Sequence, residues 1–165
     1  FAGWQISQAE YVARALGTER FISAQNHYNL MDRRAELEVL PAARAFNLGV
    51  FPYFPLNNGL LTGKYTATGG PTGSRLSYVR QYMVENADWN QLNQYAQFAQ
   101  DRGISEVDVA FGWLASQAPI ASVIAGATRV EQVQQNARSL DYQLTDDDLV
   151  ALDAIFPPAD KTALF

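Results

Sequence analysis

Three short groups of polar and aromatic side chains could together bind a flat, charged ligand. They are Gln25-Asn26-His27-Tyr28, the stretch from Tyr53 to Lys64, and the segment from Gly126 to Arg129. An aromatic ring can stack on a heterocycle, and a side-chain amide can pair with a carboxamide through its donor and acceptor together. Lys64, Arg75 and Arg129 could bind phosphate groups, although each alone would more often be a solvated surface charge.

The second group contains the string PLNNGLLTGKY, which has the glycine and lysine content of a phosphate loop. The P-loop of nucleoside triphosphatases requires G-x-x-x-x-G-K-[ST]. Here three residues separate Gly59 from Gly63, and Tyr65 stands where Ser or Thr is required. We therefore expect a phosphate-binding loop of another kind, preceded by a strand that ends in Tyr53.

His27 is the only histidine, but no carboxylate is adjacent to it in the sequence, so a structural role is expected rather than that of a general base. The Asp146–Asp148 run is explained by the start of a helix, where carboxylates favour the positive end of the dipole. The sequence predicts no metal site.

The elements that position these groups follow from apolar spacing and from capping residues. Helices are expected over 5–16 and 33–47, from Asp88 onward, from Ser105 onward, over 128–138, and from Thr145 until Pro157-Pro158 end the helix. Pro41 must kink or restart the helix over 33–47. Strands are expected over 20–25, 49–54 and 121–126, and a long loop over 66–80.

Strands that alternate with helices predict a parallel α/β fold, either a doubly wound sheet or part of a (β/α)₈ barrel. Three strands cannot close a barrel, which needs eight strands and about 250 residues, and an open sheet leaves its edges bare. In either fold ligands gather at the carboxyl ends of the strands, where all three groups lie.

Composition limits the remaining choices. The 165 residues, 48% of them hydrophobic, fit one domain over 1–165. A net charge of −5 argues against nucleic-acid or anionic-membrane binding, and no apolar run approaches the roughly 20 residues of a membrane span. Without cysteine there is no disulfide framework, which is compatible with the cytoplasmic location we expect. The chain begins at Phe1, so we expect that sequence upstream has been removed.

The chain resembles the carboxyl-terminal half of an aldo-keto reductase, closest to the branch of potassium-channel β subunits and their bacterial relatives. The resemblance lies in FAGWQISQA, QNHYNLMDRRAELEVLPAARAFNLGV, PLNNGLLTGKY, VIAGATRVEQVQQN and LTDDDLVALDAI, in that order and over nearly the whole chain. It implies the last part of a (β/α)₈ TIM barrel and an oxidoreductase that uses NADP to interconvert a small-molecule carbonyl and an alcohol.

The resemblance also implies cofactor-binding roles. Gln25 would hold the nicotinamide carboxamide, and Tyr53 would stack on the nicotinamide ring. Phe54, Pro55, Leu56, Asn57, Asn58 and Gly59 would wrap the pyrophosphate, with Lys64 on phosphate and Arg75 on the mobile loop over the cofactor. Gly126, Thr128, Gln132, Gln135 and Asn136 would bind the adenosine end, and Arg129 the 2′-phosphate of NADPH.

The departures from the family pattern matter as well. Phe54 stands where serine is usual, and His27 and Gln135 stand where glutamates are common, so a weaker grip on the cofactor is expected. The catalytic Asp, Tyr, Lys and His of the family lie on the first four strands, and this chain would begin after the fifth. We therefore expect a fragment that is inactive alone, its open edge covered by the missing amino-terminal half-barrel or by a second copy. The alternative is a dimeric half-barrel that acts as a nucleotide-binding or regulatory module.

Overall fold

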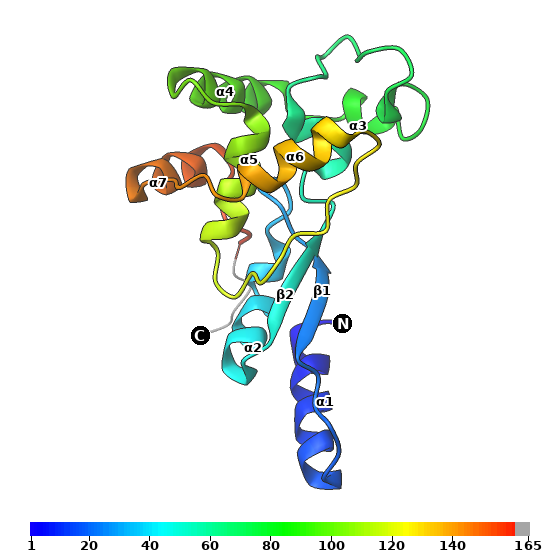
Figure 1. Ribbon diagram of the computed structural model, residues 1–165, viewed down its shortest axis with the longest axis vertical. Helices are drawn as coiled ribbons and strands as arrows, with labels where there is room; N and C mark the ends of the chain where they lie inside the picture. The colour runs from blue at the N-terminus through cyan, green and yellow to red at the C-terminus, as the bar shows by residue number, and fades with distance from the viewer. Residues whose placement is uncertain (161–165) are drawn as a thin grey trace.

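The computed structural model describes residues 1–160, which form a two-stranded parallel sheet together with several helices (Figure 1). Strand β1 (Ser23–His27) pairs with β2 (Gly49–Tyr53), in register from Ser23 opposite Gly49 to His27 opposite Tyr53. The helices are α1 (Gly3–Leu16), α2 (Val39–Phe46), α3 (Tyr82–Glu85), α4 (Trp89–Asp101), α5 (Glu106–Ser116), α6 (Val130–Ser139) and α7 (Asp146–Ile155). Short 3₁₀ turns occupy Arg34–Glu36 (η1), Asn57–Thr62 (η2) and Arg75–Ser77 (η3).

Three helix starts that the sequence predicts are confirmed by their caps. The Asp88 side chain accepts a hydrogen bond from the Gln91 N–H at the start of α4. Ser105 and Thr145 each form a capping box with the aspartate three residues later, at the starts of α5 and α7. Such caps satisfy amides that the first helical turn leaves unpaired, and each contributes about 1 kcal/mol.

Two predicted helices differ from the structure. The helix expected over 33–47 is divided into η1 and α2, and Pro41 lies in the first turn of α2, where a proline lacks no required hydrogen bond. The helix expected from Thr128 begins at Val130, with Arg129 as its N-cap. The T-x-x-E spacing of Thr128 and Glu131 is typical of a capping box, but that box does not form. The side chain that reaches back belongs to Gln132, whose Oε1 accepts from the Thr128 N–H at 2.8 Å.

The third strand, expected over 121–126, is absent; only isolated bridges join Val50 to Ile120 and Tyr53 to Ile124. Val50 exchanges regular parallel hydrogen bonds with this segment, since its N–H donates to the Pro119 carbonyl and its carbonyl accepts from the Ala121 N–H. The next donor on that edge of β2 would be Pro52, which has no N–H. The pairing therefore slips by one residue between the two bridges, and the regular sheet contains only β1 and β2 within residues 1–160.

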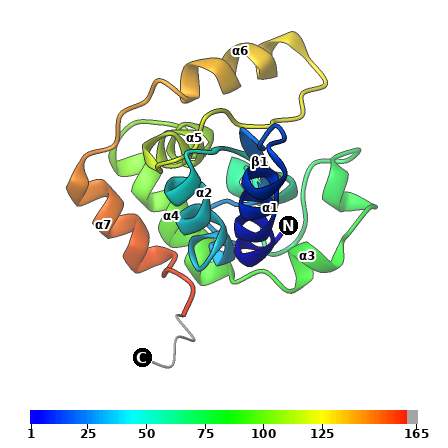
Figure 2. The ribbon, with the colours of Figure 1, turned by 90° about the horizontal axis from the view of Figure 1, so that it is seen from below.

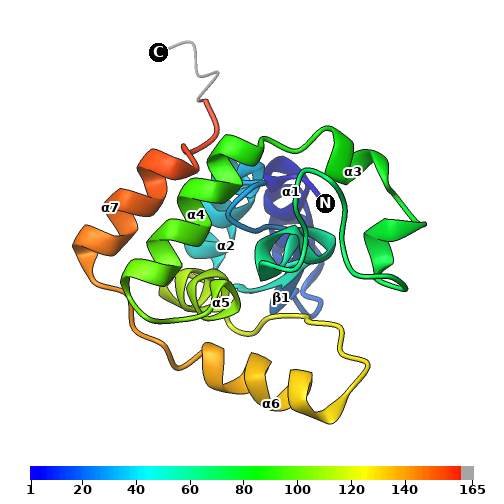
Figure 3. The same ribbon diagram turned by 90° about the horizontal axis from the view of Figure 1, so that it is seen from above.

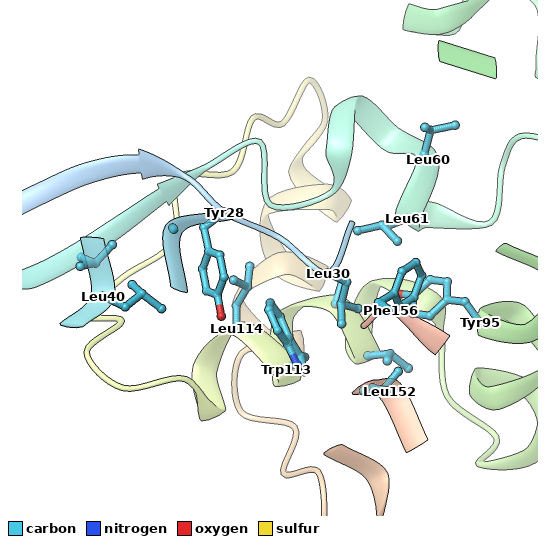
Figure 4. Close-up of a cluster of buried hydrophobic side chains, with 14 of the residues drawn as sticks. Tyr28, Leu30, Leu40, Leu60, Leu61, Tyr95, Trp113, Leu114, Leu152 and Phe156 are labelled. Atoms are coloured by element: carbon cyan, nitrogen blue, oxygen red, sulfur yellow. The ribbon is translucent and has the colours of Figure 1, made fainter. Parts of the chain in front are cut away.

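Alternation along the two strands separates two faces. Gln25, His27, Phe51 and Tyr53 point to one face, because residues two apart on a strand share a side and in-register partners do too. Val50 and Pro52 point to the other face and are buried. On that side lies the core of Figure 4, in which Tyr28 packs on Trp113 with ring centroids 5.1 Å apart.

The helices do not encircle the sheet. Figures 2 and 3 show α4, α5 and α7 on one side of the molecule and α3 with its loop on the other. The free edge of β1 begins beside Phe21 and Ile22, two residues that are 58% and 83% exposed. An apolar cleft of about 240 Å³ lies between this edge and α1. Among residues 1–160, no helix is long and apolar enough to cross a membrane.

Candidate cofactor site

The carboxyl ends of β1 and β2 assemble an aromatic cluster of His27, Tyr53 and Phe54. The rings of His27 and Tyr53 stack at 5.4 Å with an interplanar angle of 17°. Phe54 meets both rings at nearly a right angle, 5.6 Å from His27 and 5.3 Å from Tyr53. The Tyr53 ring is therefore held from two directions, which fixes its orientation before any ligand binds.

Asn29 ties this cluster together. Its Oδ1 accepts from the N–H groups of Met31 and Asp32, both at 2.9 Å, so its Nδ2 must be the atom that faces His27 and Phe54. Nδ2 donates to the Phe54 carbonyl at 2.8 Å and lies 3.2 Å from His27 Nε2. Nε2 is thus an acceptor, and the proton of the neutral ring sits on Nδ1.

His27 does have a carboxylate partner, contrary to the sequence expectation. Its Nδ1 lies 3.1 Å from Asp32 Oδ2, because the Asn29–Asp32 turn brings the chain back on itself. The signal was Asn29, since an asparagine after a strand favours a turn through its own side chain. Burial lowers the pKa of His27 below its usual value, and this outweighs the opposing effect of Asp32. Arg34 pairs with Asp32 at 2.6 Å and lowers the pKa of that carboxyl.

These groups open into a cleft of about 430 Å³. Its lining residues come from the β1–α2 turn, from the loop after β2 and from the segment after α7: His27, Met31, Asp32, Arg33, Arg34, Asn57, Pro157 and Ala159. The cleft therefore holds an ionised carboxylate, guanidinium groups and a neutral imidazole at the end of the sheet. Within residues 1–160, no group of three or more histidine, aspartate or glutamate side chains could hold a metal ion.

The loop after β2 turns tightly. Phe54, Asn57, Asn58 and Gly59 all have positive φ. The Asn57 N–H donates to the Phe54 carbonyl and the Gly59 N–H to the Leu56 carbonyl, so these two amides are already satisfied. A Cβ at Gly59 would lie 3.0 Å from Lys64 Cε, which shows how closely the lysine side chain crosses the loop. Positive charge for a phosphate would therefore come mainly from side chains.

Two arginines of the following loop supply such charge. The guanidinium carbon of Arg75 lies 5.9 Å from the centroid of the Phe54 ring, and that of Arg80 lies 5.5 Å from it. Arg80 also donates to Asn58 Oδ1 at 3.0 Å. Arg80 was not among the residues expected from the sequence; its signal was a second cation five residues after Arg75. The loop expected over 66–80 also contains the η3 turn, anchored by buried Leu76.

The residues expected at the adenosine end lie on and before α6. Thr128 and Gln132 are joined through the Gln132 Oε1, which accepts from both the N–H and the hydroxyl of Thr128. Gln135 Nε2 is 3.5 Å from Ser105 Oγ, so this amide is directed toward the start of α5. Gly126 and Arg129 are exposed, and Asn136 is half-buried.

The first turn of α5 supports both groups of residues. On one side the Glu106 carboxyl lies against Gly63, where a Cβ would be 2.7 Å from Oε1, and burial raises the pKa of Glu106. On the other side Asp108 Oδ1 accepts from the Ser139 hydroxyl of α6 at 2.5 Å. The start of α5 thus links the loop after β2 to the last turn of α6.

The structure brings the residues expected at the pyrophosphate and nicotinamide into one cluster: Tyr53, Phe54, Pro55, Leu56, Asn57, Asn58, Gly59, Lys64 and Arg75 lie at or just beyond the end of β2. Gln25 shares the sheet face of His27 and Tyr53, two residues back along β1. The α6 residues form a second set; Ile124, just before them, bridges to Tyr53.

Comparison with known proteins identifies the family of the chain. A family model described as the aldo/keto reductase family matches residues 1–156. An uncharacterized oxidoreductase, YrpG, from Bacillus subtilis (strain 168) is 31% identical over 95% of this chain and 47% of its own length. A probable voltage-gated potassium channel subunit beta from Oryza sativa subsp. japonica is 34% identical over 83% of this chain and 44% of its own. The NADH-specific methylglyoxal reductase of Escherichia coli (strain K12) is 34% identical over 75% of this chain and 38% of its own.

The chain spans about half the length of these curated relatives. Its two-stranded parallel sheet and its helices form a mixed α/β structure, and the family model matches nearly all of it. The chain belongs to the aldo-keto reductase family.

Proposed function

We propose that this chain is the cofactor-binding half of an NADP-dependent aldo-keto reductase, which interconverts a small-molecule carbonyl and an alcohol. The observation that carries the proposal is the fixed Tyr53 ring at the end of β2, beside a tight loop whose neighbouring cations are Lys64 and Arg75. A flat ring and a cationic loop in succession suit a dinucleotide, which offers a flat base next to two phosphates.

The chain's own side chains would divide the work by position. Tyr53 would stack on the nicotinamide, and Gln25, on the same sheet face, would hold its carboxamide. Lys64 and Arg75 would hold the pyrophosphate. The nicotinamide, when bound, would supply the hydride. A Tyr53 ring held by His27 and Phe54 would restrict the orientation of a stacked nicotinamide, which favours transfer in one geometry.

We test this with binding titrations of NADPH, followed by the fluorescence of the reduced nicotinamide. Tyr53→Leu removes the stacking ring and should weaken binding about tenfold or more, within the range of one aromatic contact. Tyr11→Leu is the matched control, because Tyr11 is 61% exposed on α1. Equal affinity of the two variants would refute the assigned role of Tyr53.

The proposed preference for NADP depends on Arg129, the exposed N-cap of α6, which would bind the 2′-phosphate at the adenosine end. One relative is named as NADH-specific, so the preference must be measured directly. Arg129→Gln should lower the affinity for NADPH and leave that for NADH unchanged. Equal affinity of the unmodified chain for both cofactors would remove the NADP assignment.

Catalysis would require groups beyond these 165 residues. The general acid of the family would come from the amino-terminal half of the barrel, so we expect the isolated chain to bind cofactor without turning it over. The assay is NADPH-dependent reduction of 4-nitrobenzaldehyde. Measurable turnover by the isolated polypeptide would overturn this expectation.

We further propose that the open edge of β1 is covered in the working protein by the amino-terminal half-barrel. The support is the unpaired edge itself, the exposed side chains of Phe21 and Ile22, and the apolar cleft beside α1. Sedimentation of the isolated chain decides between this partner and a second copy. A monomer that associates with an added amino-terminal half supports the proposal, and a stable homodimer would favour a dimeric half-barrel module.

A further inference from the structure

The two arginines beside Phe54 share one ring. Arg75 and Arg80 come from different turns of the loop that follows Lys64, yet both guanidinium groups lie within 6 Å of the Phe54 centroid at 5.9 and 5.5 Å. Cations at this distance from a phenyl ring are attracted by the negative charge of its face. We propose that Arg80, held by Phe54 and Asn58, is a second phosphate-binding residue of the site and grips the pyrophosphate together with Arg75.

This proposal rests on the proposed dinucleotide function and adds a residue that the family resemblance did not assign. Arg80 is fixed more firmly than Arg75, because it also donates to Asn58 Oδ1 at 3.0 Å. Asn58 belongs to the tight loop after β2, which is expected to wrap the pyrophosphate. This bond therefore joins that loop to the loop that carries Arg75 and Arg80. Arg80 is thereby placed over the same loop as Phe54.

Phe54 itself is positioned by the sheet. Its carbonyl accepts from Asn29 Nδ2 at 2.8 Å, and its ring meets those of His27 and Tyr53 at nearly right angles. The backbone of Phe54 has a φ of 55°, a conformation that non-glycine residues rarely adopt. A bulky side chain held in such a conformation indicates that contacts around the ring compensate for the strain.

The charge around these arginines is not neutralised. No aspartate or glutamate occurs between Glu38 and Glu85, although the chain is acidic as a whole, with a net charge of −5. Among residues 1–160, the ion pairs involve neither Lys64 nor Arg75 nor Arg80. Two guanidinium groups on one ring repel each other, so an anion between them would relieve that repulsion.

A pyrophosphate fits this arrangement chemically. It carries two adjacent phosphoryl groups, and a guanidinium can donate two parallel hydrogen bonds to each. The two guanidinium groups beside the Phe54 ring would therefore match the two phosphates, one each. A lysine would contribute only a point charge, without the paired hydrogen bonds. This predicts that Arg80→Lys restores only part of what Arg80→Gln loses.

The experiment measures binding of NADPH and of inorganic pyrophosphate by calorimetry. The variants are Arg80→Gln, Arg80→Lys and Phe54→Leu, and far-UV circular dichroism checks that each is folded. Arg44→Gln is the matched control, because Arg44 lies in the last turn of α2, away from the carboxyl ends of the strands. We expect Arg80→Gln to weaken both ligands about tenfold, Phe54→Leu to weaken both by a smaller factor, and Arg44→Gln to change neither.

The outcomes separate this inference from the proposed function. Loss of pyrophosphate affinity in Arg80→Gln supports the phosphate role of Arg80, even if the unmodified chain does not bind NADPH. Tight NADPH binding that depends on Tyr53 but not on Arg80 supports the function and overturns the inference. Binding of neither ligand by the unmodified chain overturns both.

Discussion

Arg33 joins the turn that lines the larger cleft to the carboxyl-terminal helix, and replacing it tests that link. Its side chain is only 7% exposed. Nε and Nη2 donate to the two carboxylate oxygens of Glu36 at 2.7 and 3.1 Å, and Nη1 donates to Asp153 and, at 2.9 Å, to the Phe156 carbonyl. The guanidinium also lies 5.1 Å from the centroid of the Trp113 ring.

Arg33→Met keeps much of the apolar stem and removes every one of these polar bonds. Breaking a buried ion pair costs about 3–5 kcal/mol, because the remaining partner stays partly desolvated. Water reaches Glu36 and Asp153, whose side chains are 21% and 45% exposed, so the lower end of that range applies. We expect a loss of about 3 kcal/mol, which in a chain of this size lowers the Tm by about 6–12 °C.

The assay is urea and thermal unfolding followed by far-UV circular dichroism. The control is Arg34→Met, one residue away, because the Arg34 side chain is 77% exposed and its partner Asp32, although only 15% exposed, keeps His27 Nδ1 as a second partner at 3.1 Å. Surface pairs contribute about 0–1 kcal/mol, so the control should hardly change stability. Equal losses for the two variants would refute the reasoning, since burial would then not determine the effect.

Three further changes test the site and its support. Folding lowers the pKa of His27, so as the pH falls below about 6.5 the unfolded chain binds the proton more readily and the free energy of unfolding should decrease. In His27→Phe, the free energy of unfolding measured in urea should change less between pH 7.5 and pH 5.5. Burial raises the pKa of Glu106, so Glu106→Gln should increase the free energy of unfolding at pH 7 but not near pH 4. The control Glu131→Gln, at an exposed position of α6, should not increase the free energy of unfolding at either pH, and equal effects of the two variants would contradict this. Gly59→Ala should weaken NADPH binding more than Gly69→Ala, because both glycines have positive φ but a Cβ has open space only at Gly69.

The predictions from sequence succeeded where the signal is local. Asp88, Ser105 and Thr145 were identified as caps because a capping residue acts within its own helical turn. The third strand failed because its existence depends on a neighbour: Pro52 of β2 cannot donate to it, and this matters only once the two segments lie side by side. A proline in the adjacent strand was the available warning.

Among the residues of the candidate site, too, those with a local sequence signal were predicted and those that depend on distant contacts were missed. The position of Tyr53 at a strand end follows from the local pattern, whereas the contact of Asp32 with His27 and that of Arg80 with Phe54 arise from turns whose paths the sequence does not specify. In both contacts a charged side chain from a turn or loop lies beside an aromatic ring at the end of a strand. The missed residues are therefore those whose role depends on how loops fold back.

The first turn of α5 explains how the two sets of expected cofactor residues could act together. Glu106 contacts Gly63 of the loop after β2, while Asp108 accepts from Ser139 at the end of α6, and only one residue separates these two carboxyl side chains. A rotation of that turn would move both partners at once, because Glu106 is in close contact with Gly63 and Asp108 holds Ser139 by a hydrogen bond of 2.5 Å. The capping box at Ser105 opposes such a rotation by fixing the turn. We therefore expect the start of α5 to set the spacing between the loop proposed to bind pyrophosphate and the residues proposed at the adenosine end.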